Sequence, residues 1–129
     1  MGSRLADLVG EVDLIVSSPA ARAMATARIV AEAMGYPADA IGEDERIYEA
    51  GPAELLAVIR DIDPALATVL LFGHNPGLTQ LVNELSEPLV DNVPTCGAVE
   101  LRLAIEGWAD VSRTTTRRGA FLTPKDGEA

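Results

Sequence analysis

The sequence TVLLFGHNPG at residues 68–77 decides the fold of this protein of 129 residues. Its first half, 68–72, is a short apolar run typical of a buried strand in a parallel sheet. Gly73 ends that run, and Asn75-Pro76-Gly77 turns the chain into a helix. His74, the single histidine of the protein, stands at this turn. Open α/β sheets bind their ligands at such turns, so the pattern predicts a ligand site that contains His74.

Composition restricts the class of protein. A length of 129 residues fits one domain, and 48% of the residues are apolar, which is enough for a core. The net charge of −10 argues against nucleic-acid and membrane-surface binding, which both need a basic face. We expect a cytoplasmic protein, because no apolar run is long enough to span a bilayer and no leader peptide is evident. The single cysteine, Cys96, excludes an internal disulfide and is expected to be an inert thiol.

A second apolar run lies upstream at residues 12–17 and predicts another interior strand. Ser18 and Pro19 follow as the expected N-cap and first residue of a helix that ends at Gly35. We also expect a helical tail at 3–9, helices after Pro52 and over 78–85, a one-sided strand over 99–105 and a short strand over 118–123, with loop at 36–45 and 87–95. This order indicates an α/β fold, a three-layer α/β/α sandwich with a mostly parallel sheet and an antiparallel edge.

The two interior strands are expected to be parallel neighbours, so their carboxyl ends open on one edge of the sheet. Ser18, Arg22, His74 and Asn75 then lie within reach of one another. Two helix N-termini point at the same place, and helix N-termini favour anions. Arg22 is expected in the first turn of a helix, where its positive charge opposes the helix dipole. A phosphate bound between the guanidinium and the helix end would explain an arginine at this position. The sequence therefore predicts a phosphate site with no metal and no cofactor, since no Cys/His cluster has ligand spacing.

Each candidate residue also has an ordinary structural explanation. Arg22 is at even odds a solvated helix arginine, and His74 is equally well a neutral histidine that caps the next helix. Its functional interpretation is a donor to a phosphoryl oxygen in the transition state. Glu49 lies in an exposed connector and is either a solvated carboxylate or a general acid or base.

Residues 17–27, SSPAARAMATA, resemble the S-S-P-x-x-R-A-x-x-T-A segment of the histidine phosphatase (phosphoglycerate mutase-like) superfamily. Residues 73–77, GHNPG, resemble the second-histidine motif of the same superfamily. Residues 46–50 and 121–126 are similar to its small SixA-type phosphohistidine phosphatases. The two central motifs are specific in combination, and the resemblance covers about residues 5–126.

This resemblance implies a phosphatase that needs no metal and forms a phosphohistidine intermediate. It assigns Arg22 to the phosphate pocket, His74 to stabilising the transferring phosphoryl group, and Glu49 to the region of the proton donor. Ser18 and Asn75 are expected beside them at the phosphate. The implied partner is a phosphohistidine-bearing protein or a small phosphorylated substrate, with no nucleic acid or membrane. The oligomeric state stays open.

The sequence departs from the family pattern because it has no Arg-His pair, which carries the attacking histidine. We therefore expect residues 1–129 to be one histidine-phosphatase-like domain that is incomplete at its N-terminus. Missing upstream residues explain this better than decay of the site, because Arg22 and His74 persist and an absent central strand would leave two strand edges unpaired. The chain by itself is expected to be inactive.

Three functions remain open on the sequence. The first is a phosphohistidine phosphatase, with a general phosphomonoesterase of the same superfamily as its alternative. The second is a non-catalytic phosphoryl-binding module. The third is an ordinary α/β domain in which Arg22 and His74 have no role in binding.

Overall fold

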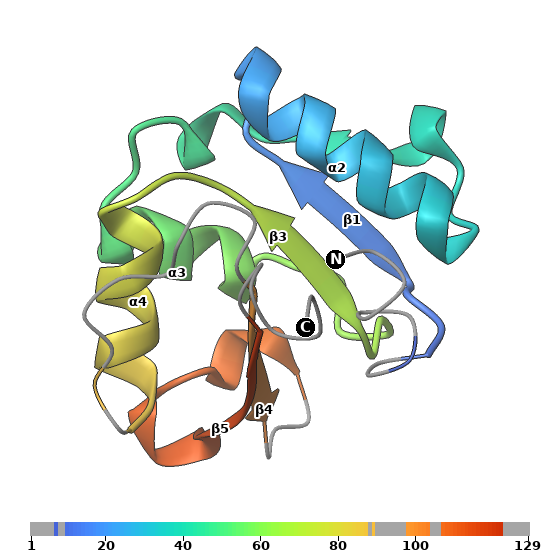
Figure 1. The fold of residues 1–129 in the computed structure, drawn as a ribbon. Coiled ribbons are helices and arrows are strands. Elements are labelled where there is room, and N and C mark those ends of the chain that lie inside the picture. Colours follow the sequence, from blue (N-terminus) through green and yellow to red (C-terminus); the bar gives the residue numbers. More distant parts are fainter. Residues whose placement is uncertain (1–6, 8–9, 88, 90–97, 104–106, 123–129) are drawn as a thin grey trace, which may run out of the picture.

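The computed structural model describes residues 7, 10–87, 89, 98–103 and 107–122 (Figure 1). Its elements in chain order are β1 (Leu14–Ser17), α2 (Ala21–Met34), β2 (Gly42–Glu43), α3 (Pro52–Arg60), β3 (Val69–Phe72), α4 (Gly77–Leu85), β4 (Ala98–Leu103) and β5 (Thr116–Leu122). Short 3-10 helices cover Ala38–Ala40, Glu45–Ile47, Trp108–Asp110 and Arg113–Thr115.

The central sheet has three parallel strands in the order β2-β1-β3. In its register Ile15 lies opposite Leu70, and Ser17 lies opposite Phe72. The two predicted interior strands are therefore confirmed as parallel neighbours. Strand β2 falls within the predicted loop, and its two residues pair with Val16 and Ser17. It was missed because two residues are too few to display any periodicity.

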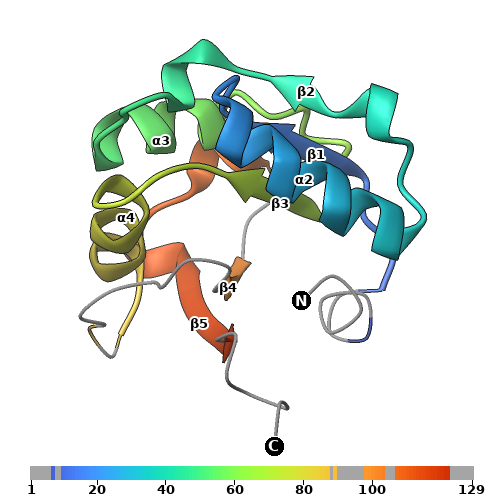
Figure 2. The ribbon, with the colours of Figure 1, turned by 45° about the horizontal axis from the view of Figure 1, so that its top comes forward.

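Helices cover both faces of this sheet, which confirms the predicted three layers. Successive side chains of a strand point to opposite faces, so Ile15 packs toward α2 while Val16 packs toward α3 and α4. In Figure 2, α2 crosses in front of β1 and β3. The core on the α2 side contains Ile15, Met24, Ala27, Ala31 and Ile41. The core on the other side contains Val16, Ile47, Leu55, Val58, Leu81, Leu85 and Val111.

The antiparallel part of the fold is a separate pair, β4 and β5. We expected an antiparallel edge on the main sheet, but no hydrogen-bonded ladder joins this pair to β3 among the described residues. Figures 1 and 2 show β4 and β5 apart from the parallel strands. An apolar cavity of about 420 Å³ lies between them and is lined by β3, β4, α3 and α4. Its walls include Val69, Leu70, Leu71, Leu81, Leu101 and Trp108.

The helix boundaries follow the predicted signals closely. Helix α2 ends at Met34, and Gly35 takes the left-handed conformation with φ of 73° that glycine tolerates best. Pro52 begins α3 as expected. Helix α2 begins at Ala21, two residues later than Pro19. None of the helices in the described part of the chain has the length and apolar character needed to cross a bilayer.

Several expectations concern residues outside the described part. The helical tail at 3–9 falls there except for Asp7, as do Cys96, most of the loop over 87–95, the last residues of the strand over 99–105, and the segment after residue 122.

Candidate active site

The carboxyl ends of β1 and β3 bring His74 into contact with Ser18. The Nε2 atom of His74 lies 2.8 Å from the Oγ atom of Ser18. The backbone N–H of Ser18 donates to the carbonyl oxygen of Phe72 over 3.0 Å, which continues the pairing of the two strands past the sheet. The expected proximity of these two residues is therefore confirmed, and it follows directly from the parallel register.

Ser18 is fully buried at the start of α2, with an exposed fraction of 0%. Its Oγ accepts a hydrogen bond from the backbone N–H of Ala20 over 3.2 Å. Its carbonyl oxygen accepts from the hydroxyl of Ser17 over 2.9 Å. We expected Ser18 to be the N-cap, but the N-cap is Ala20. Ser18 lies two residues earlier, where its hydroxyl connects the start of the helix to His74.

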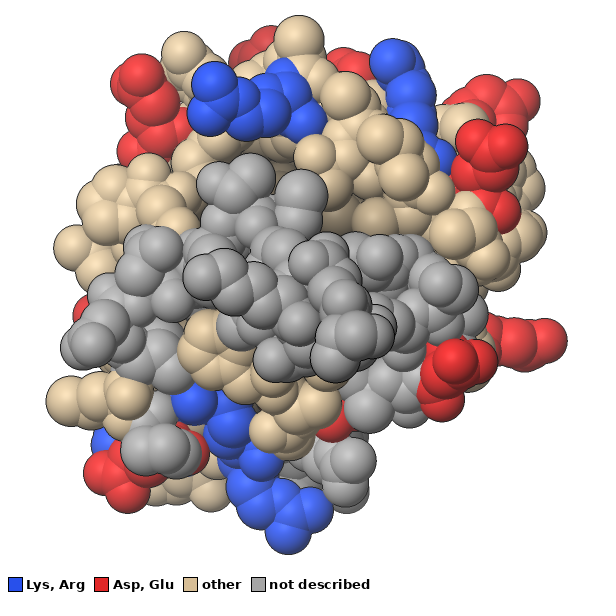
Figure 3. Space-filling model, viewed as in Figure 1, with Lys and Arg blue, Asp and Glu red and all other residues tan. Residues whose placement is uncertain are grey.

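Arg22 is the second residue of α2 and is exposed. The first backbone N–H groups of a helix have no partner within it, and together with the dipole they attract anions. Arg22 thus adds a positive side chain to the positive end of a helix. It forms no ion pair with any described residue. Figure 3 shows basic side chains at the upper edge of the molecule, where Figure 1 places α2.

Arg46 is a second cation on this edge of the sheet, but carboxylates neutralise it. Its guanidinium lies 2.8 Å from Asp44 and 2.6 Å from Asp61. The hydrogen bonds from Arg46 hold the pKa of the Asp44 carboxyl below its ordinary value, and the two carboxylates raise the pKa of Arg46. The backbone of Asp44 bonds to the carbonyl oxygen of Ser17, so this network adjoins the end of β1. Arg22 differs from Arg46 in having no carboxylate partner in the part of the chain that the structure describes.

Tyr48 completes one side of the His74 environment. Its ring meets the imidazole edge-on, with centroids 5.8 Å apart and an interplanar angle of 87°. Tyr48 is nevertheless 54% exposed, so His74 lies near the surface under an aromatic side chain. Our sequence reasoning did not select Tyr48. The sequence feature that could have identified Tyr48 is its position in the segment 46–50, beside Glu49.

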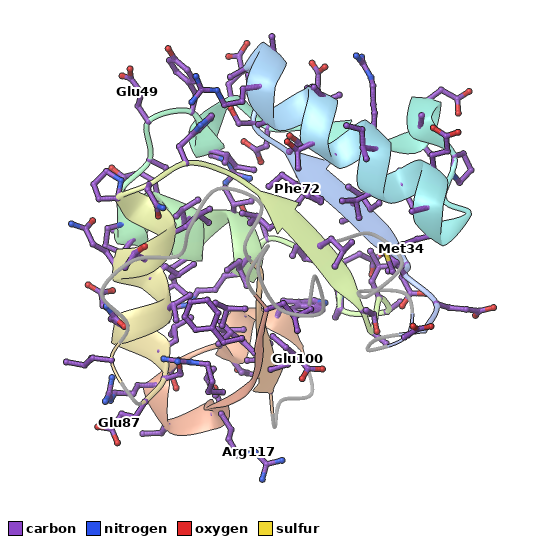
Figure 4. All side chains as sticks on the ribbon, viewed as in Figure 1. Met34, Glu49, Phe72, Glu87, Glu100 and Arg117 are labelled. Atoms are coloured by element: carbon purple, nitrogen blue, oxygen red, sulfur yellow. The ribbon has the colours of Figure 1, made fainter. Side chains whose placement is uncertain are left out.

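Glu49 lies on the same connector but faces away from the sheet. Its backbone has a positive φ of 52°, which is uncommon for a residue other than glycine. Figure 4 shows its side chain directed outward from the end of the molecule where β1 and β3 finish. No hydrogen bond or ion pair joins Glu49 to another described residue. The structure therefore places Glu49 at the end of the sheet where β1 and β3 finish, without bringing its side chain to His74.

Asn75 uses its side chain to begin α4. Its Oδ1 accepts from the backbone N–H of Thr79 over 3.2 Å and from the Thr79 hydroxyl over 2.8 Å. An amide oxygen repels phosphate oxygens, so any contact of Asn75 with phosphate falls to its amide nitrogen.

Gly77 allows the connector to approach α4 closely. A Cβ at Gly77 would collide with the carbonyl oxygen of Ala50. The first turn of α4 therefore lies directly against the segment that carries Tyr48 and Glu49, and this contact fixes one wall of the site.

The residues at these strand ends have the chemistry to attract an anion. They include a helix N-terminus, a histidine held by a buried hydroxyl, and an arginine with no carboxylate partner among the described residues. The described residues contain no group of three or more His, Cys, Asp or Glu side chains that could hold a metal ion.

Comparison with known proteins adds one result. Neither a scan of protein-family models nor a search of curated proteins found a match. A search of solved structures found a protein of Nakamurella multipartitia provisionally described as the phosphohistidine phosphatase SixA. The two have a TM-score of 0.78 and 23% sequence identity, over 96% of this chain and 77% of the other. The chain therefore shares the fold of that protein, in agreement with the fold that its motifs predicted.

Proposed function

We propose that this chain is the phosphoryl-binding part of a phosphohistidine phosphatase. The observation that carries the proposal is the contact of His74 with Ser18, 2.8 Å long, at the N-terminus of the helix that presents Arg22. The fold shared with the protein described as SixA supports the same assignment.

In this function Arg22 and His74 hold the oxygens of the transferring phosphoryl group. The planar guanidinium of Arg22 matches two phosphoryl oxygens, and the imidazole of His74 donates to a third. The first N–H groups of α2 add fixed positive dipoles. Such groups stabilise the charge of the transition state without moving, and this is usually the largest contribution to phosphoryl transfer. Glu49 is the proposed proton donor for a poor leaving group.

The attacking histidine is proposed to belong to a segment outside this sequence. His74 is the only histidine of the chain, and its Nε2 is already bonded to Ser18. In the first step the external imidazole nitrogen attacks phosphorus, the P–N bond of the donor phosphohistidine breaks, and the donor imidazole takes up a proton. In the second step water attacks phosphorus, the new P–N bond breaks, and inorganic phosphate leaves.

Phosphate binding by this chain tests the pocket without any catalysis. We expect inorganic phosphate to shift the NMR signals of His74 and of the first turn of α2. Arg22→Ala should weaken binding about tenfold, as the loss of a charge-assisted contact predicts. The matched control is Arg28→Ala, which removes another exposed arginine of α2 and should leave the affinity unchanged. Equal affinities of the Arg22→Ala and Arg28→Ala variants would contradict the pocket.

In this proposal, turnover requires a protein that contains both this chain and the segment with the attacking histidine. That protein should release phosphate from a phosphohistidine-bearing protein domain, and His74→Ala should abolish that release. Release from a small phosphomonoester alone would favour a general phosphomonoesterase. Phosphate binding without release from either substrate would identify a non-catalytic binding module.

A further inference from the structure

We propose that Ser18 is a positioning residue that fixes the tautomer of His74, so that neutral imidazole carries its proton on Nδ1. We predicted from the sequence that Ser18 binds phosphate directly. The structure instead points to a role that acts through His74. The benefit of this role to catalysis rests on the proposed function, but the tautomer itself does not.

The position of Ser18 leaves its hydroxyl little freedom. Its backbone N–H bonds to Phe72, and its carbonyl oxygen accepts from Ser17. Its side chain is fully buried between the end of β1 and the start of α2. The Oγ atom is therefore held at a fixed place 2.8 Å from Nε2 of His74.

The hydrogen-bond inventory of Ser18 decides which atom donates. A hydroxyl has one proton to donate and two lone pairs to accept with. The N–H of Ala20 can only donate, and it occupies one lone pair. If Nε2 also donated to Oγ, the hydroxyl proton would be buried with no acceptor among the described residues, which is unfavourable. The arrangement that satisfies every group has the Ser18 hydroxyl donating to Nε2.

With Nε2 accepting, the proton of the neutral ring must lie on Nδ1. No described residue bonds to Nδ1, which is then the donor available to a ligand. The edge contact with Tyr48 packs against the ring and resists its rotation. Ser18 thereby determines which ring nitrogen of His74 carries the proton that is donated to a phosphoryl oxygen.

The single histidine makes this directly measurable in the chain as it exists. Two-bond 15N–1H correlation spectra under alkaline conditions, where imidazole is neutral, report the two ring nitrogens of His74 without any assignment problem. We expect the Nδ1–H tautomer to dominate. A spectrum dominated by Nε2–H, or an even mixture of the two forms, would overturn the proposal.

Ser18→Ala should move the ratio of the two tautomers toward Nε2–H by roughly fivefold, the ratio that one net hydrogen bond supports. The matched control is Ser17→Ala, because Ser17 is the neighbouring buried serine and its hydroxyl bonds to Ser18 rather than to His74. That variant should keep the wild-type ratio. An unchanged ratio in Ser18→Ala would overturn the proposal, and if this variant does not fold, the wild-type spectrum alone decides.

The tautomer of His74 and the proposed function can be tested separately. Loss of phosphate binding with an intact Nδ1–H tautomer would remove the function and leave the positioning role. A dominant Nε2–H tautomer with normal phosphate binding would remove the positioning role and leave the function. In the full-length enzyme, Ser18→Ala should lower kcat more than it raises KM, and Ser18→Thr, which retains the hydroxyl, should restore the tautomer and part of the rate.

Discussion

Strands β1 and β3 are equally long and similarly apolar, and they differ in what surrounds them. β1 has a strand on each side, and its residues Ile15–Ser17 are buried. β3 pairs only with β1 among the described residues, and each of its four residues is half-buried. The apolar cavity borders β3, and residues of β4 line the same cavity. The core of this domain is therefore centred on β1, while β3 forms one wall of a space that the described residues leave open.

The largest expected effect compares two residues that face each other in the sheet. Ile15 of β1 lies opposite Leu70 of β3, and both contribute to the core under α2. Ile15→Ala should lower the free energy of unfolding by about 2–5 kcal/mol, because it opens a cavity in a fully buried site. Leu70→Ala should cost roughly 1–2 kcal/mol, since part of that side chain already contacts water. Urea denaturation of both variants measures the difference.

Equal losses for Ile15→Ala and Leu70→Ala would contradict the difference in burial between β1 and β3. They would mean that β3 is covered in solution as completely as β1.

A smaller effect concerns the turns that follow the two strands. After β3, Asn75 precedes the N-cap of α4 and accepts from the backbone N–H of Thr79 in the first turn. After β1, the Ser18 hydroxyl accepts instead from the N–H of the α2 N-cap, Ala20. Asn75→Ala should therefore lower the free energy of unfolding by about 1 kcal/mol, because the first turn of α4 loses a side-chain acceptor, as it does when a capping side chain is removed. It should leave phosphate affinity nearly unchanged, which separates Asn75 from Arg22. A phosphate affinity reduced tenfold would instead restore Asn75 to the phosphate site.

The smallest effect lies at the opposite end of the same two strands. The Asp13 carboxylate accepts from the backbone N–H groups of Ala67 and Thr68, over 2.8 and 3.0 Å, and ties the start of β1 to the start of β3. These backbone hydrogen bonds lower the pKa of Asp13 below its ordinary value. Its contribution to stability is therefore present above the unfolded pKa of about 4 and is lost as the pH falls through the lower folded value.

Asp13→Asn should flatten this dependence. Urea midpoints measured from neutral pH down to about pH 2.5 should fall less steeply for the variant than for the wild type. Parallel curves would show that the carboxylate does not connect the two strands in solution.

Sequence reasoning predicted the features that depend on burial and on backbone requirements. The apolar runs gave β1 and β3, and Gly35 gave the end of α2 because the left-handed conformation favours glycine. The neighbouring parallel strands then placed Ser18 beside His74. These features could be predicted because each follows from one local physical requirement.

The remaining features depend on which of several possible partners a side chain contacts. Differences of a few tenths of an ångström decide which acceptor the hydroxyl of Ser18 uses. They also decide whether the Asn75 oxygen faces a ligand or Thr79. The contact of Tyr48 with His74 joins residues 26 positions apart on a connector that no periodicity describes. The separation of β4 and β5 from the sheet is a property of the packed chain and leaves no trace in the alternation of the strand residues.

Trp108 gives the apolar cavity an optical reporter. It is the only tryptophan of the protein, it lines the cavity, and its indole N–H is anchored to the carbonyl oxygen of Leu66 over 3.0 Å. The indole is therefore held at a fixed point on the cavity wall. When the cavity is filled, the surroundings of the indole become less polar. Any apolar segment or small molecule that enters between β3 and β4 can be followed by a blue shift of intrinsic fluorescence, without a label.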